Sequence, residues 1–200
     1  MKLYHGTSTD NLKGIIKDKA IRPRTCNGNW NHTLTSNNQM VYLTNCYGVS
    51  FGFSAAKQLA SEDVNWNAED YDESFACVIE LDISVKNLYP DEDAIEQLTR
   101  KQSHWVKMFD DLGIDDMVGR TNYFKKNIAD YKDLWKDSID GLGTVAHKGS
   151  IPISKIKRVS ILKDEVFLLS QPTITIENYR FLGERYKHEC ETLIWTKDYA

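Results

Sequence analysis

The chain of 200 residues is long enough for one well-buried domain, and its 41% hydrophobic and 27% charged residues are ordinary for a globular protein. Its net charge is -4, whereas dedicated nucleic-acid binders usually carry a basic surface. The charge therefore favours a protein partner, with a nucleic acid bound by a local basic patch as the alternative. Because no stretch approaches the roughly 18 uninterrupted apolar residues of a membrane span, and no secretory leader is visible, we expect a cytoplasmic protein with no membrane partner.

The first predicted elements are a strand, a helix and a long loop. Residues 2–5 are predicted to form a short strand, and Ser8 or Thr9 to cap a helix over residues 10–19. Three apolar residues share one face of this helix at i, i+3, i+4 spacing: Leu12, Ile15 and Ile16. Residues 25–39 form a polar loop rich in asparagine, and loops of this length are often binding loops.

The middle of the chain predicts two strands on either side of a helix. Residues 40–44 (MVYLT) are expected to form a strand, and residues 47–61 a helix that two glycines weaken. A polar loop follows at 62–74. Residues 75–83 (FACVIELDI) are the clearest buried strand of the sequence.

Two amphipathic helices are predicted next. They cover residues 93–109 and 121–136, and Gly113 and Gly119 are expected to separate them. We interpret residues 91–138 as a helical insertion in the domain, one that could help to select a target.

The remaining elements are mainly strands. We expect strands at 144–147, 155–163 and 165–170, and a C-terminal extension over residues 164–200. Strands and helices alternate without a regular order, which predicts a single α+β domain with a split antiparallel sheet.

The cysteines do not suggest a metal site. Their spacing contains no CxxC pair and no histidine partner at zinc spacing. In a reducing cytoplasm all of them are expected to be free thiols, and no metal is expected. The four positions are Cys26, Cys46, Cys77 and Cys190.

Three segments in a fixed order carry a resemblance to a known family. Residues 3–8 (LYHGTS) open the chain, residues 41–44 (VYLT) follow on a second strand, and residues 75–83 form a third. This set resembles the His-Tyr ADP-ribosyltransferases of the diphtheria-toxin and poly(ADP-ribose) polymerase type, to which tRNA 2′-phosphotransferases and DNA-ADP-ribosylating toxins are related. The resemblance covers roughly residues 2–163, and it implies an ADP-ribosyltransferase-like fold that uses NAD as a co-substrate, with no metal.

The resemblance assigns the nicotinamide end of NAD to four residues. The backbone of Gly6 would pair with the carboxamide, because a glycine lets the backbone come close. Tyr42 would stack on the cationic ring. The relatives carry a serine eight residues and an aromatic residue eleven residues after this tyrosine, and these offsets fall on Ser50 and Phe53.

Residues of the first strand and the polar loop are expected to bind the rest of the dinucleotide. In the resemblance His5 would bond the adenosine-side ribose and Thr7 would assist it, while Arg24 is a candidate for the pyrophosphate. Once NAD is held, positioning and charge stabilisation would supply most of the catalysis of glycosidic bond cleavage.

One catalytic element departs from the family pattern. Many relatives place a glutamate at the start of the strand that precedes an IPxxxI-like motif, and here that position is Thr144. His147 and Asp140 are the nearest titratable alternatives. Loss of such a group can cost about 10²–10³ in rate, and its absence argues against polymer formation more than against transfer.

These features predict a NAD-dependent mono-ADP-ribosyltransferase that modifies a macromolecule, with a protein as the favoured acceptor and a nucleic acid as the alternative. The resemblance suggests a toxin, a phage-encoded modifier or a defence factor. The missing glutamate leaves open an inactive module that binds NAD or ADP-ribose. An NAD glycohydrolase is a further alternative, as is an RNA 2′-phosphotransferase, although near these motifs the latter would have only Arg22 and Arg24 for its phosphate.

Purely structural interpretations stand beside these assignments. His5 and His147 are candidates for ordinary strand histidines, and Tyr42 and Phe53 for core aromatics. The acidic run at residues 91–93 is explained by its attraction to the positive end of a helix dipole. A basic cluster on a later strand is explained by a solvated strand face, with a polyanionic target as the alternative: Lys155, Lys157 and Arg158.

Overall fold

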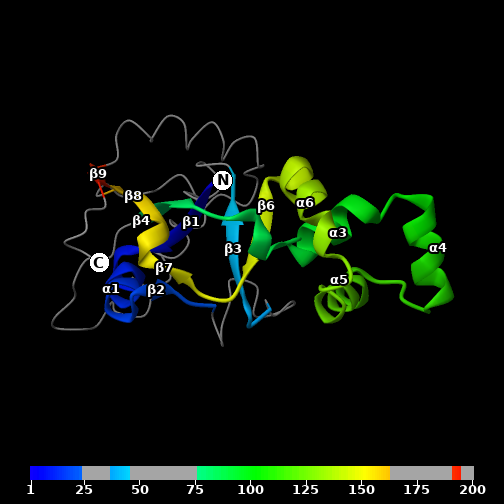
Figure 1. Cartoon of the computed structure of the whole chain (residues 1–200). Coiled ribbons are helices and arrows are strands. Elements are labelled where there is room, and N and C mark those ends of the chain that lie inside the picture. Colours follow the sequence, from blue (N-terminus) through cyan, green and yellow to red (C-terminus); the bar gives the residue numbers. More distant parts are fainter. Residues whose placement is uncertain (24–36, 46–75, 163–190, 195–200) are drawn as a thin grey trace, which may run out of the picture. The chain divides into compact units, whose positions relative to one another are not determined.

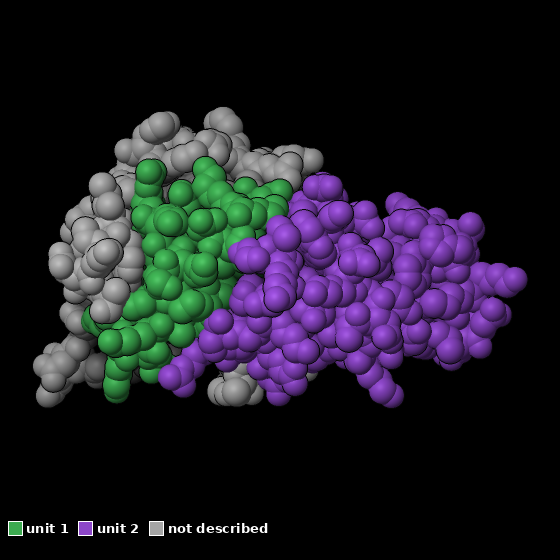
Figure 2. Space-filling model, in the orientation of Figure 1, with its two compact units in different colours: residues 1–21, 43–83, 151–200 green, residues 22–42, 84–150 purple. Residues whose placement is uncertain are grey.

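The computed structural model combines helices with antiparallel strands, which confirms the predicted α+β class (Figure 1). It describes residues 1–23, 37–45, 76–162 and 191–194. The chain forms two compact units, each assembled from separate segments (Figure 2). Unit 1 contains residues 1–21, 43–83 and 151–200, and unit 2 contains residues 22–42 and 84–150.

Unit 1 is built on an antiparallel sheet. Strand β1 (Lys2–Ser8) pairs with β4 (Ala76–Asp82), β4 pairs with β8 (Ile156–Leu162), and β8 pairs with β9 (Glu191–Ile194). The sequence correctly predicted β4 and β8. It ended the first strand too early, because β1 continues to Ser8 and so carries the whole HGT segment.

Helix α1 (Thr9–Asp18) packs against β1 and β4 and covers part of this sheet (Figure 1). Ser8 is its N-cap, as predicted, and its hydroxyl oxygen accepts a hydrogen bond from the Asn11 N–H. Leu12 and Ile15 are buried, and Ile16 is only partly buried. The helix ends at Lys19, whose left-handed backbone (φ 54°) lets its N–H reach the carbonyls of the last turn.

The core of unit 1 lies between this helix and the sheet. Leu3, Ile79, Leu81 and Val159 are fully buried strand residues. Cys77 is a free thiol, as expected, and its burial raises its pKa. A small second sheet completes the described part of the unit: it pairs β2 (Ala20–Ile21) with β7 (Ile151–Pro152).

Unit 2 combines three short strands with a group of helices. Its strand order is β5 (Leu88–Tyr89), β6 (Thr144–Lys148) and β3 (Met40–Thr44), whose last two residues belong to unit 1. Strand β5 follows a single 3-10 turn, η1 (Val85–Asn87), and pairs antiparallel with β6. Strands β3 and β6 were predicted from the sequence.

The helices of unit 2 are more broken than the sequence predicted. Helices α3 (Glu92–Thr99) and α4 (Ser103–Asp111) replace the single helix expected at 93–109. The second predicted helix is replaced by three elements, which are α5 (Met117–Lys126), η2 (Lys132–Leu134) and α6 (Trp135–Leu142). Helix α3 packs on both α5 and α6 (Figure 1).

Side-chain hydrogen bonds explain both breaks. The Thr99 hydroxyl donates to the Ile95 carbonyl and so competes with the backbone at the end of α3. The Asn127 side-chain amide donates to the Tyr123 carbonyl and closes α5. Gly119 was wrongly predicted to separate the helices, because it lies in the first turn of α5 and its N–H donates to the Asp116 carboxylate that caps the helix.

An aromatic core holds these helices together. Phe109 and Phe124 are almost fully buried and meet edge to face, with 5.6 Å between ring centroids. Trp105 and Tyr131 pack against Phe124 in the same manner. Tyr123 is also partly buried and packs against the same cluster.

Several predicted elements lie outside the described residues. These are most of the polar loop at 25–39, the helix at 47–61, the loop at 62–74, the strand at 165–170 and all of the 164–200 extension except β9. Residues 37–39 of the loop form a turn that leads into β3.

Candidate functional site

The most unusual polar contact in unit 2 joins Tyr42 to Glu92. The Tyr42 hydroxyl donates to Glu92 Oε1 over 2.5 Å, between residues 50 positions apart in the chain. The backbone N–H of Asn37 donates to both groups, at 2.9 Å to the Tyr42 hydroxyl oxygen and 3.3 Å to Glu92 Oε1. Burial, followed by the charge of Glu92, raises the pKa of Tyr42, so this phenol remains a hydrogen-bond donor.

The start of helix α3 fixes the position of this carboxylate. Asp91 is the N-cap, and its side chain accepts from the Asp93 N–H over 3.1 Å. Glu92 is therefore the first helical residue, where the free N–H groups and the helix dipole favour a negative charge. Glu92 is only 3% exposed, and this setting partly offsets the cost of burying its charge.

The two carboxylate oxygens of Glu92 differ in their partners. Oε1 receives the two hydrogen bonds described above, whereas Oε2 is buried and has no hydrogen-bond partner among the described residues. A buried carboxylate oxygen in this state costs free energy, because it has lost its water without gaining a donor.

Two neighbouring carboxyl groups have raised pKa values. Desolvation, with the charges of Glu92 and Asp93, raises the pKa of Asp91 to about 7, although a hydrogen bond from the Thr144 side chain opposes the shift. Desolvation, with the charges of Glu92 and Glu96, raises the pKa of Asp93 to about 6. A carboxyl group with a pKa near 7 is suited to general acid–base catalysis at neutral pH.

Hydrogen bonds of Ser138, a residue of α6, link the start of α3 to β6. Its hydroxyl accepts from the Asp91 N–H over 3.1 Å and donates to the Thr144 carbonyl over 2.7 Å. The residue is completely buried. One oxygen atom therefore holds three elements of unit 2 at the place where the carboxyl groups gather.

Two of the predicted catalytic residues of unit 2 contact the acidic residues at the start of α3. Tyr42 contacts Glu92, and Thr144 contacts the adjacent Asp91. The position at which the resemblance expects a glutamate thus has the carboxyl group of Asp91 beside it. Asp140, the other titratable alternative, is an exposed residue of α6.

His147 has a setting of its own on β6. It is 7% exposed, and its Nδ1 lies 3.2 Å from the Gly149 carbonyl oxygen. Desolvation lowers its pKa, so the ring is neutral at pH 7. None of its contacts in the described part of the chain reaches the carboxyl groups of α3.

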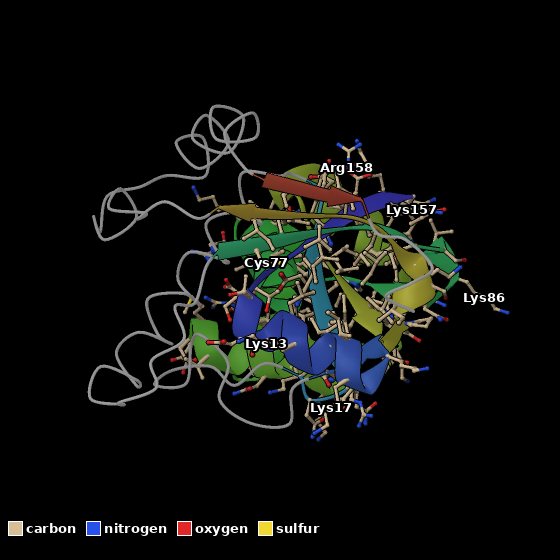
Figure 3. The ribbon with its side chains drawn as sticks, turned by 90° about the vertical axis from the view of Figure 1, so that its left-hand side faces the viewer. Lys13, Lys17, Cys77, Lys86, Lys157 and Arg158 are labelled. Atoms are coloured by element: carbon tan, nitrogen blue, oxygen red, sulfur yellow. The ribbon has the colours of Figure 1, made fainter. Side chains whose placement is uncertain are left out.

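The remaining described candidates lie in unit 1, on β1. His5 and Gly6 are half-buried and Thr7 is buried, and the three residues pair with Ile79, Val78 and Cys77 of β4. Arg24, Ser50 and Phe53 lie outside the described residues. The basic cluster is also in unit 1, where Lys157 and Arg158 are exposed on β8 (Figure 3).

Sequence reasoning did not identify Glu92 as a functional residue. The acidic run at 91–93 was attributed to helix-start electrostatics, which is a correct description of Asp91 as an N-cap. The contact with Tyr42 depends on the tertiary fold, and no local pattern announces it. The only signal was an excess of acidic residues, three in succession where one N-cap would suffice.

The described residues define an α+β protein. Its unit 2 holds a group of acidic residues beside Tyr42, which we call the tyrosine–carboxylate cluster and which consists of Tyr42, Asp91, Glu92 and Asp93. Comparison with protein-family models, curated proteins and solved structures found no match to this chain. No helix in the described ranges has the length and apolar character needed to cross a membrane. Among the same residues, no group of three or more His, Cys, Asp or Glu side chains is arranged to hold a metal ion.

Proposed function

We propose that the protein is a NAD-dependent mono-ADP-ribosyltransferase whose catalytic carboxylate is Glu92. The observation that supports this proposal is the buried Glu92 side chain, which accepts a hydrogen bond from Tyr42 and whose Oε2 has no partner in the part of the chain that the structure describes. Tyr42 is the residue to which the family resemblance gives nicotinamide stacking. His5, Gly6 and Thr7 keep the roles that the resemblance gives them.

The proposed chemistry uses two carboxyl groups for two tasks. As the glycosidic bond of NAD breaks, nicotinamide leaves with the bonding electron pair and the ribose becomes cationic. The negative charge of Glu92, held beside Tyr42, stabilises this cation. Asp91, with its pKa near 7, takes the proton of the acceptor nucleophile as that nucleophile bonds to the ribose carbon.

The test follows nicotinamide release and label transfer from NAD to a cell lysate. Glu92→Gln keeps the shape of the side chain and removes its charge, and we expect a fall of about 10²–10³ in kcat with a small change in KM. Asp137→Asn on α6 is the control for charge loss at an exposed carboxylate, and it should leave the rate unchanged. Equal rates for Glu92→Gln and wild type would refute the role of Glu92.

The position of Thr144 favours one alternative, a module that binds NAD or ADP-ribose without turnover. Calorimetry with NAD distinguishes it, since it predicts binding without nicotinamide release. Release of nicotinamide without label on any macromolecule would indicate a glycohydrolase. Removal of a 2′-phosphate from RNA without release to other acceptors would indicate a phosphotransferase.

A further inference from the structure

A second polar feature of unit 2 involves lysines and the aromatic ring of Tyr89. Lys132 Nζ lies 5.2 Å from the centre of the ring, and Lys148 Nζ lies 5.7 Å from it. Lys132 Nζ also donates to the backbone carbonyl of Lys86 over 2.9 Å, so the backbone of a third lysine lies beside it. We call Lys86, Tyr89, Lys132 and Lys148 the lysine–tyrosine patch.

Three separate elements build this patch. Tyr89 is on β5, directly after the turn that carries Lys86. Lys148 ends β6, which pairs with β5, and Lys132 begins η2, which packs on β5. Lys86 and Lys148 are exposed and Lys132 is half-buried, and Figure 3 shows the Lys86 side chain extending away from the ribbon.

Within the described ranges, none of the three lysines of the patch forms an ion pair. The two ammonium groups both lie within 6 Å of the centre of one ring, so their like charges repel each other and the repulsion weakens as salt is added. An anion that binds between them removes this repulsion, and the ring face adds only a weak attraction to each cation.

Phosphate is an anion that the lysines of the patch can bind, because lysine binds phosphate as a compact point charge. Ammonium groups beside an aromatic ring are also the combination that binds single-stranded nucleic acids.

We propose that the lysine–tyrosine patch binds the phosphodiester backbone of a single-stranded nucleic acid. The proposal goes beyond the transferase activity and does not depend on it, because binding through this patch requires no NAD. If both proposals hold, the nucleic acid bound here is a candidate acceptor for ADP-ribose.

The test measures fluorescence anisotropy of a labelled 12-nucleotide single strand, without NAD, over a range of salt concentrations. For the double variant Lys132→Gln/Lys148→Gln we expect at least a fivefold rise in Kd. The slope of log K against log salt should fall by about 1.4, because each phosphate contact on a single strand contributes about 0.7. Circular dichroism checks that the variants are folded.

The matched control is Lys13→Gln/Lys17→Gln, which removes two exposed lysines from α1 in unit 1 (Figure 3). This variant should keep the wild-type Kd and salt slope. Tyr89→Phe should also bind as wild type, since it keeps the ring, whereas Tyr89→Leu should weaken binding. Equal losses in both double variants, no binding by the wild type, or equally strong competition by polyglutamate would overturn the proposal. All these outcomes leave the Glu92 experiment unaffected.

Discussion

At the scale of single residues, the carboxyl groups at the start of α3 carry most of the chemical interest. Asp91 and Asp93 have raised pKa values, whereas a carboxylate that merely caps a helix is expected to have a lowered one. Desolvation therefore outweighs the helix dipole here. Keeping these two half-buried groups ionised at neutral pH therefore lowers the stability of the fold.

This cost gives the unfolding free energy a definite pH dependence. The pKa of Asp91 is raised to about 7 and that of Asp93 to about 6, from an ordinary value near 3.8. The folded state thus binds these protons more tightly than the unfolded state, and their contribution to stability is lost as the pH rises from about 4 to 7. We expect the urea midpoint of Asp91→Asn to fall less over this range than that of the wild type.

Asp110→Asn, on the exposed end of α4, is the control for this measurement. Its urea midpoints should follow those of the wild type at every pH. A wild-type midpoint that rises between pH 5 and pH 7.5 in step with that of Asp91→Asn would contradict the raised pKa of Asp91.

Residue by residue, the sequence revealed one half of the tyrosine–carboxylate cluster. Tyr42 was found through its place in the VYLT segment, and Thr144 through the IP that follows it. Glu92 was missed because its partner is 50 residues away. An N-cap depends only on residues that are neighbours in the sequence. The burial of Glu92 Oε2 without a partner among the described residues depends on the tertiary fold, which no local pattern records.

At the scale of elements, strands and their neighbours were easier to predict than helix ends. Strand β4 and helix α1 have strong periodic patterns, and the structure confirms both. The break between α3 and α4 has no glycine or proline to mark it. It arises from the Thr99 hydroxyl and from packing of α3 against α5, neither of which periodicity records.

Two glycines in different helices offer a test of helix packing. A Cβ on Gly141 of α6 would lie 2.6 Å from Leu98 Cδ2 of α3, whereas a Cβ on Gly14 of α1 would meet nothing within 4 Å. We expect Gly14→Ala to raise the unfolding free energy by about 0.5–1 kcal/mol, through helix propensity. Gly141→Ala should lower it by about 1 kcal/mol, because Leu98 must move in a packed core.

Chemical denaturation of both variants gives the comparison, with each glycine serving as control for the other. Equal stabilisation by the two substitutions would show that α6 and α3 are not in close contact at Gly141.

At the scale of the whole molecule, the two units differ in the candidates they hold. Unit 1 carries His5, Gly6 and Thr7, and unit 2 carries Tyr42, Thr144 and His147. Each unit takes segments from several parts of the chain, so no simple truncation isolates one of them. The net acidic charge of the chain argued for a protein acceptor, yet the lysine–tyrosine patch shows that local charge can differ from the average.

Binding of NAD should be visible as stabilisation of the folded chain. A ligand present at 100 times its Kd raises the unfolding free energy by about 2.7 kcal/mol if it binds only the folded state. We expect NAD to raise the Tm of the wild type and of Glu92→Gln, since the charge of Glu92 is proposed to act mainly in the transition state. His5→Ala should lose the shift. No Tm change in the wild type at millimolar NAD would argue against NAD as the ligand.

Ser138 has a consequence for which substitutions the protein can tolerate over evolution. Its hydroxyl is at once acceptor for Asp91 and donor to Thr144, inside a site with no exposed surface. Alanine would supply neither bond, threonine would add a methyl group to a fully buried position, and cysteine would form weaker bonds with a larger atom. Position 138 should therefore be close to invariant under selection for folding alone, whatever reaction the neighbouring carboxyl groups perform.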